Sequence, residues 1–285
     1  ENLKKFVDIR TAQLAIRGEH KPVFRRVGRI EDRYFLDLCQ EGKVIEMTAG
    51  GWQVLDEPEG VYFIRRNSED EALPIPESGG NVMALSAVVN LFEQYLKLVL
   101  AYLVAALRPD FPFLVLILEG EAGSGKSTLA RILKYLIDPS KELIRAMPPG
   151  EDAFAVYATN SHLLALDNLD HITSSQSDML CRAATGGGFS KRKLYSDADE
   201  VVLSIKRPVI ITGIEGLVDR ADMADRVALV QLERVSSQSR MPEADLWPLV
   251  EEIRPQVLGG ILDAFCAGLK NLDTVKLDNL PRMAD

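Results

Sequence analysis

The segment from Gly120 to Thr128, GEAGSGKST, constrains the fold of this chain more than any other part of the sequence. It follows residues 113–118, an uninterrupted apolar run of the kind found in parallel strands that are buried on both faces. It precedes a stretch with Leu129, Ile132 and Leu133 on one helical face. A glycine-rich turn from a buried strand into a helix predicts an α/β fold, in which helices cover a parallel sheet.

The fixed residues of this segment match the phosphate-binding loop (P-loop), G-x-x-x-x-G-K-[ST]. Glycines let backbone N–H groups curl around a β-phosphate, and the following helix adds its positive N-terminus. We expect Lys126 to reach the β- and γ-phosphates and the Ser127 hydroxyl to ligate Mg²⁺. ATP and Mg²⁺ are therefore the predicted cofactors. The expected nucleotide-binding residues are Gly120, Glu121, Ala122, Gly123, Ser124, Gly125, Lys126, Ser127 and Thr128.

Two further catalytic residues are expected where neighbouring strands end. The apolar run 163–166 ends at Asp167, and a P-loop enzyme needs a second carboxylate there to hold the Mg²⁺ water shell. The run 208–212 ends at Thr212, where a sensor of the γ-phosphate is expected. The alternative is that both residues only terminate their strands.

Asn168 stands where many hydrolytic P-loop proteins carry the acid that polarises the attacking water. Asp170 and Glu121 are possible substitutes for that acid. Arg226, which borders the predicted strand 227–232, is a candidate for an arginine that stabilises charge on the γ-phosphate of an adjacent subunit. The alternative for Arg226 is an ordinary ion-pair network within a short charged helix.

The densest basic patch is residues 190–195, SKRKLY. Cations in this patch would attract a nucleic-acid backbone, and the tyrosine could stack on a base. The expected DNA-binding residues are Lys191, Arg192, Lys193 and Tyr195. The alternative is a solvated turn, in which Asp197, Asp199 and Glu200 pair with these cations across a hairpin.

The residue composition and the hydrophobic pattern of the sequence change near residue 80. This change predicts three parts. Residues 1–80 form a small β-rich module with an exposed linker at 67–81, residues 81–240 form the P-loop core, and residues 241–285 form an incomplete helical lid. The strands expected in the module are 34–38, 43–47, 52–55 and 61–65. The helices expected after it are 83–107, 173–184 and 243–280, and Thr173 and Gln176 have the spacing of a capping box.

Composition excludes several classes of protein. With 47% hydrophobic and 26% charged residues, the 285-residue chain has the profile of a globular protein, and its net charge of −9 argues against a surface that binds nucleic acid all over. Cys39, Cys181 and Cys266 lie too far apart for a zinc cluster and are odd in number. The longest apolar stretch, 95–107, is too short and interrupted to span a bilayer. We therefore expect a cytoplasmic protein with no membrane partner.

The motifs occur in the order P-loop, LALDN, TGGGF-x-x-RKLY, RPVIITGIEG and MADR. Over residues 34–285, this order resembles the AAA+ helicase ATPases, including superfamily 3, of phages, plasmids and integrated elements. It is also similar to bacterial primase-helicase-like proteins in which a β-rich segment ending in a GW motif precedes the ATPase. The resemblance implies a ring, with a hexamer favoured, and the roles given above for Lys126, Ser127, Asp167, Thr212 and Arg226. It further implies a pore-facing hairpin within 186–208 and a second sensor at Arg282.

These expectations combine into an ATP-driven helicase or translocase that acts in replication of a mobile element. Its expected partners are single-stranded or forked DNA and a primase domain or protein. Two alternatives remain open. One is a switch or remodelling ATPase that acts on protein, suggested by the acidic surface. The other is a ring-assembly module that binds ATP without hydrolysing it, suggested by Asn168.

Overall fold

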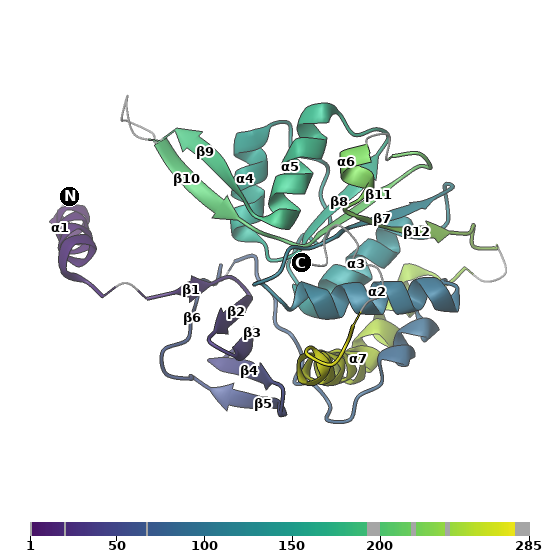
Figure 1. Ribbon diagram of the computed structural model, residues 1–285, viewed down its shortest axis with the longest axis horizontal. Helices are drawn as coiled ribbons and strands as arrows, with labels where there is room; N and C mark the ends of the chain where they lie inside the picture. Colours follow the sequence, from purple (N-terminus) through teal and green to yellow (C-terminus); the bar gives the residue numbers. More distant parts are fainter. Residues whose placement is uncertain are drawn as a thin grey trace.

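The computed structural model describes residues 2–19, 21–66, 68–192, 200–217, 221–236 and 240–276 (Figure 1). Its centre is a four-stranded sheet in the order β12-β7-β11-β8, with every neighbouring pair parallel. The strands are β7 (Val115–Gly120), β8 (Leu164–Leu169), β11 (Val209–Gly213) and β12 (Val227–Leu232). Arg145 extends the sheet beyond β8 through a single parallel bridge to Leu166. The fold class predicted from the sequence, a parallel sheet with flanking helices, is confirmed.

Alternate residues of the buried strands supply two separate cores, one on each face of the sheet. On one face, Leu116 and Leu118 of β7 pack with α2 (Glu93–Ala106), α3 (Lys126–Ile137) and α7 (Glu243–Asn271). On the other face, Val115 and Ile117 pack with α4 (Glu151–Asn160) and α5 (Ser174–Thr185). This pattern explains why the strands are continuous apolar runs, since both faces are covered.

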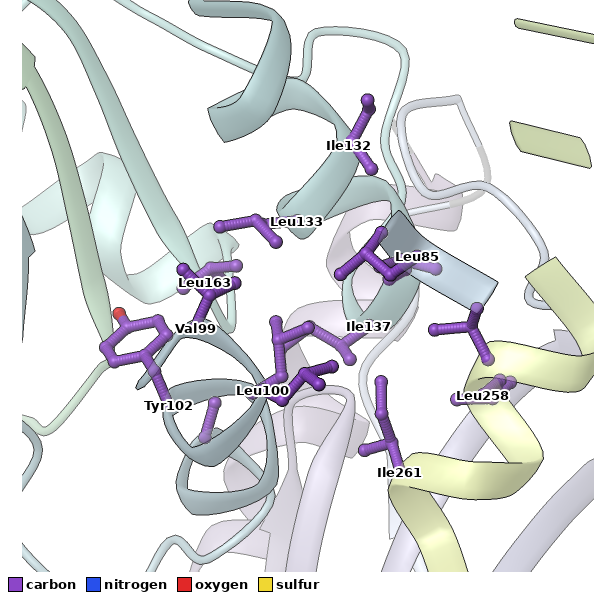
Figure 2. Packing of buried hydrophobic residues seen from close by; sticks show 14 of the residues in the cluster. Leu85, Val99, Leu100, Tyr102, Ile132, Leu133, Ile137, Leu163, Leu258 and Ile261 are labelled. Atoms are coloured by element: carbon purple, nitrogen blue, oxygen red, sulfur yellow. The ribbon is translucent and has the colours of Figure 1, made fainter. Parts of the chain in front are cut away.

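Figure 2 shows how three helices meet on the first of these faces. Ile137 of α3 and Leu100 of α2 lie between their helices, and Leu258 and Ile261 approach from α7. Tyr102 of α2 is also buried, and its hydroxyl donates to the carbonyl of Val209 at 2.8 Å. The buried apolar side chains of α3, from Leu129 to Ile137, therefore pack in the core that α2 and α7 share.

The N-terminal β-rich module is an antiparallel sheet of β2 (Val27–Ile30), β3 (Arg33–Gln40), β4 (Lys43–Thr48) and β5 (Gly51–Asp56). The pair β1 (Val23–Phe24) and β6 (Tyr62–Phe63) lies beside it. The module packs directly on α7, where Tyr34 meets Phe265 edge to face and the indole N–H of Trp52 donates to Asp263 at 2.7 Å. Module and α7 therefore share one hydrophobic core with the P-loop helix.

A buried charge cluster fastens the module to the end of the P-loop helix. The Asp138 carboxylate accepts from Arg26 Nε at 3.1 Å and from Lys134 Nζ at 2.8 Å. It also accepts from the backbone N–H groups of His162 and Leu163. These cations hold the pKa of Asp138 well below its usual range despite its burial. The cluster thus connects the module, α3 and the start of β8 through one ionised carboxylate.

Residues 68–81, which link the module to the core, differ from the exposed linker that the sequence predicts. Leu73 is fully buried, and its N–H donates to the carbonyl of Leu38. Further along, the N–H groups of Glu77 and Asn81 donate to carbonyls of α7 at Pro255 and Gln256. The segment is therefore packed at Leu73 and Pro76 and hydrogen-bonded to α7, whereas residues 77–79 stay exposed.

Other boundaries also differ from the sequence expectations. The helix expected at 83–107 is divided into a short 3₁₀ helix, η1 (Val82–Ala87), and α2. The tail helix, α7, ends at Asn271, and α1 (Asn2–Arg17) and α4 were not anticipated. The capping box on α5 is confirmed, with Thr173 and Gln176 bonded reciprocally. In the view of Figure 1, α1 stands apart from the rest of the chain.

No helix within the described ranges combines the length and the apolar character needed to cross a membrane.

Candidate nucleotide-binding site

The P-loop follows β7 directly and winds through glycines with positive φ. The φ angles are +154° at Gly120, +81° at Gly123 and +86° at Gly125, values that L-residues with side chains rarely adopt. The Ser124 N–H donates to the carbonyl of Glu121 and tightens the turn. Helix α3 begins at Lys126, so its first N–H groups face the loop. The backbone therefore forms an anion-binding concavity at a helix N-terminus.

Lys126 folds back over this loop. Its Nζ donates to the carbonyls of Gly120 at 2.6 Å and Glu121 at 2.8 Å. Partial burial lowers the pKa of Lys126, and the nearby Asp167 carboxylate opposes that shift. The ammonium group is thus placed at the loop, where a phosphate would compete with the two carbonyls for it.

Asp167 is the centre of a hydrogen-bonded group at the carboxyl edge of the sheet. Its Oδ1 accepts from Ser127 Oγ at 2.7 Å and from Thr212 Oγ1 at 2.6 Å. The N–H of Asn168 in turn donates to Thr212 Oγ1 at 2.9 Å. Because β11 lies between β7 and β8, the ends of three strands bring these residues together. The structure thus brings Lys126, Ser127, Asp167 and Thr212 together beside the loop, and their roles toward a nucleotide stay predictions.

The donor set fits Mg²⁺. This ion binds through oxygen and commonly keeps several waters, with one or two protein oxygens and the substrate phosphates completing its shell. Ser127 offers a hydroxyl and Asp167 a carboxylate, 2.7 Å apart, beside the phosphate-binding loop. Both side chains would hold the ion there, and Thr212 would orient the carboxylate.

Asn168 has a left-handed backbone conformation, with φ of +56°. Asparagine tolerates this region better than most residues with side chains. The two suggested substitutes for the missing acid, Asp170 and Glu121, are both exposed. A third acid, Glu119, is buried at the end of β7, where its Oε1 accepts from the N–H of Leu217 at 3.0 Å. Glu119 was not among the expected residues, although an acid at the end of an apolar strand is a signal that the sequence contains.

A pocket of 430 Å³ opens beside the P-loop. Its walls come from the loop itself, from the segment after η1, from the end of β12 and from the start of α7. Apolar residues line most of it, including Val88, Val89, Ile132, Leu232 and Leu246. Asn90, Arg240 and Glu243 add polar groups. Apart from residues of the P-loop and α3, the lining could not be predicted from the sequence, because it comes from distant segments without a common motif.

Arg226 lies at the opposite end of the strands from this site. Its carbonyl accepts from the N–H of Val115 at the start of β7, whereas Gly120 at the end of β7 pairs with Leu232. The intervening length of strand is roughly 16 Å. Arg226 instead borders a surface hollow with Glu151 and Arg182. Within one chain, the structure does not bring Arg226 together with Lys126.

The basic patch falls on an antiparallel hairpin of β9 (Gly187–Arg192) and β10 (Glu200–Ile205) (Figure 1). Lys191 and Arg192 lie on β9, and the register places Arg192 opposite Glu200. Five residues with an expected role or pairing lie outside the described ranges: Lys193, Tyr195, Asp197, Asp199 and Arg282. The hairpin expected within 186–208 is confirmed, and its expected position in a pore stays a prediction.

Two solved structures are similar to this chain at low sequence identity. The C-terminal region of NrS-1 is 14% identical with a TM-score of 0.47, and the match covers 83% of this chain and 65% of that one. JCV helicase is 14% identical with a TM-score of 0.38, and the match covers 69% of this chain and 61% of that one. The chain thus spans just under two thirds of these structures. No curated protein sequence matches it.

A family match covers residues 82–285, from the start of η1 through the P-loop core and beyond α7. It therefore includes every residue of the candidate site as well as the hairpin. The family is described as actinomycete integrative conjugative element replication protein. The resemblance to replication proteins of integrated elements is confirmed, and the chain belongs to this family.

Proposed function

We propose that this replication protein is an ATP-hydrolysing motor that translocates on DNA, as a helicase, during replication of its element. The observation that carries the proposal is the convergence of Lys126, Ser127, Asp167 and Thr212 at one sheet edge beside a pocket of 430 Å³. An ammonium, a hydroxyl and a carboxylate at a glycine loop are the groups that nucleoside triphosphate binding requires.

In this proposal, the base of ATP enters the apolar pocket and its phosphates lie along the P-loop. Lys126 exchanges its carbonyl partners for phosphate oxygens, since a charge-assisted contact to phosphate is stronger than one to a carbonyl. Bound Mg²⁺ would neutralise charge on the phosphates. Thr212 holds the Asp167 carboxylate by its short hydrogen bond, so that the carboxylate keeps its orientation.

The proposal assigns Arg226 to the site of a neighbouring copy in a ring, with a hexamer favoured. Its Nε is buried without a hydrogen-bond partner among the described residues, and its position at the far edge of the sheet leaves it remote from its own P-loop. The β9–β10 hairpin supplies the DNA contact through Lys191, Arg192, Lys193 and Tyr195. Its extension away from the sheet supports this assignment (Figure 1). A primase domain or protein would be the further partner, in the cytoplasm.

Asn168 favours a second candidate function, a ring-assembly module that binds ATP without hydrolysis. The residue replaces the acid that commonly polarises water, and the acids at 121 and 170 are exposed. A remodelling ATPase that acts on protein is a further alternative, which predicts turnover that DNA does not change.

The test is ATP turnover by the purified chain, with and without single-stranded DNA, across protein concentrations that span assembly. The helicase proposal predicts turnover that DNA stimulates and that rises more steeply than protein concentration. Lys126→Ala is the control that should abolish nucleotide binding. Tight ATP binding with no turnover under any condition would favour the assembly module instead.

A second experiment isolates the hairpin. Replacing Lys191, Arg192 and Lys193 together by Ala should weaken binding of single-stranded DNA and reduce its salt dependence, because fewer phosphates are neutralised. Replacing Lys4, Lys5 and Arg10 of α1 by Ala removes the same number of cations elsewhere and serves as the matched control. Unchanged DNA affinity in the hairpin variant would remove the hairpin from the proposal.

A further inference from the structure

Between β12 and α7, the described residues 233–236 and 240–242 reach the P-loop at two points. The N–H of Val235 donates to the carbonyl of Gly123 at 3.3 Å. Further along, Arg240 brings its guanidinium to the same glycine, since a Cβ atom added to Gly123 would lie 2.8 Å from Arg240 Nη2. Two residues of one connection therefore contact the middle of the phosphate-binding loop.

Arg240 also lines the 430 Å³ pocket, on which the loop residues Gly123, Ser124 and Gly125 border as well. The acid nearest to it in sequence, Glu243, is already engaged, because Arg131 Nη1 donates to Glu243 Oε1 at 2.6 Å. Among the described residues, Arg240 itself has no carboxylate partner. A guanidinium without a carboxylate at the border of a glycine loop and an apolar pocket is suited to bind an anion.

We infer that Arg240 is a phosphate-binding residue of the nucleotide site, and this inference rests on the function proposed above. A nucleotide with its base among Val89, Leu232 and Leu246 and its β-phosphate on the P-loop must pass its ribose and α-phosphate between the two. Arg240 lies at that passage, against Gly123. Its guanidinium donates to the phosphate nearest the ribose.

The experiment measures the affinity of the full chain for ATP, ADP and adenosine by calorimetry. Arg240→Ala should weaken ATP and ADP binding by about tenfold to a hundredfold, the range expected for one charge-assisted hydrogen bond. Adenosine, which has no phosphate, should bind this variant as well as wild type. Arg240→Lys should keep part of the affinity, because a charge remains but the two-pronged geometry is lost.

Arg234→Ala is the matched control, since Arg234 is an exposed arginine on the same connection that does not line the pocket. It should bind all three ligands like wild type. Arg240 is exposed, so its substitution should leave the thermal unfolding of the nucleotide-free chain unchanged.

The outcomes separate this inference from the proposed function. If wild type binds ATP, Lys126→Ala does not and Arg240→Ala binds like wild type, the role of Arg240 is overturned and the proposed site stands. Equal losses for adenosine and ADP in Arg240→Ala would also overturn it, because they would indicate a change in pocket shape. If wild type binds no ATP, both are overturned.

Discussion

Thr212 shows how one side chain serves two neighbours in the candidate site. Its hydroxyl donates to Asp167 and accepts from the Asn168 N–H, and the residue is buried. We predict that Thr212→Val destabilises the chain by about 1 kcal/mol, because it removes the part-buried hydrogen bonds to the Asn168 N–H and the Asp167 carboxylate, and that it reduces ATP turnover. Thr212→Ser keeps the hydroxyl and should stay close to wild type. Chemical denaturation and turnover measurements check both. If Thr212→Val retains wild-type turnover, the orienting role of the hydroxyl is refuted.

His162 makes stability depend on pH. Burial lowers its pKa to about 4, although Asp138 opposes the shift, and its Nε2 bonds to the carbonyl of Ala106 at 2.8 Å. The unfolded state, with a pKa near 6.5, binds a proton more readily than the folded state between about pH 6.5 and 4. Stability therefore falls as the pH falls through this window, by about 2 kcal/mol between pH 7 and pH 5.

His162→Gln keeps a side-chain donor for Ala106 but has no proton to bind. Urea denaturation of wild type and variant at pH 7 and pH 5 should show the smaller loss of stability in the variant. Equal losses in the two proteins would show that another group controls the dependence on pH.

At the scale of elements, the packing of the linker on α7 requires glycine at the point of closest contact. A Cβ atom added to Gly259 would collide with the carbonyl oxygen of Glu77, whereas one added to Gly268 meets open space. Both residues lie within the same helix. Gly268→Ala should stabilise the chain by about 0.5–1 kcal/mol through helix propensity. Gly259→Ala should destabilise it by about 1–3 kcal/mol, because the linker must move.

Thermal and chemical unfolding of both variants check this prediction, with Gly268→Ala as the control for helix propensity. A stabilised Gly259→Ala variant would mean that the linker does not pack on α7 as described.

The elements with strong local signals were predictable from the sequence, and the others were not. β7 and β11 are short apolar runs with turn residues after them, because both of their faces are buried. The capping box of α5 and the P-loop are local motifs. Helix α4 has no such signal, since its apolar residues are spread around it. The break between η1 and α2 could not be predicted, because apolar residues continue through it.

The residues of the candidate site also fall into those with a local sequence signal and those without one. Ser127, Asp167 and Thr212 could be found because each ends or follows a recognisable strand or loop. Arg240 and the pocket could not, because their position depends on contacts of Val235 and Arg240 with Gly123, more than a hundred residues away in the sequence. No local pattern in a sequence records such contacts.

At the scale of the whole molecule, the β-rich module and the P-loop helix are parts of one structure. The core that holds α3 also contains Leu36 and Ile45 of the module and Leu258 of α7. Arg26 and Asp138 join the module to the end of α3 by a buried ion pair. Removing one partner of such a pair leaves an uncompensated buried charge, so the module supports the P-loop helix directly.

The proposed ring predicts that each active site contains residues from two copies. Arg226 lies at the start of β12, and the P-loop lies at the far end of the paired strand β7. Lys126→Ala should be inactive because its own site lacks the phosphate-binding ammonium. Arg226→Ala should be inactive because it lacks the cation offered to the neighbouring site, while its nucleotide affinity stays close to wild type.

Mixing the two inactive variants should therefore restore turnover. In a mixed ring, a subunit with Lys126 intact can lie beside a subunit with Arg226 intact, and each such pair forms one complete site. For random mixing in equal amounts, about a quarter of the sites are complete, which sets the expected level of recovery. Arg182→Ala, which removes another arginine from the same surface hollow, should keep activity and serves as the control. If the mixture stays inactive while each variant still assembles, Arg226 does not act across the subunit boundary.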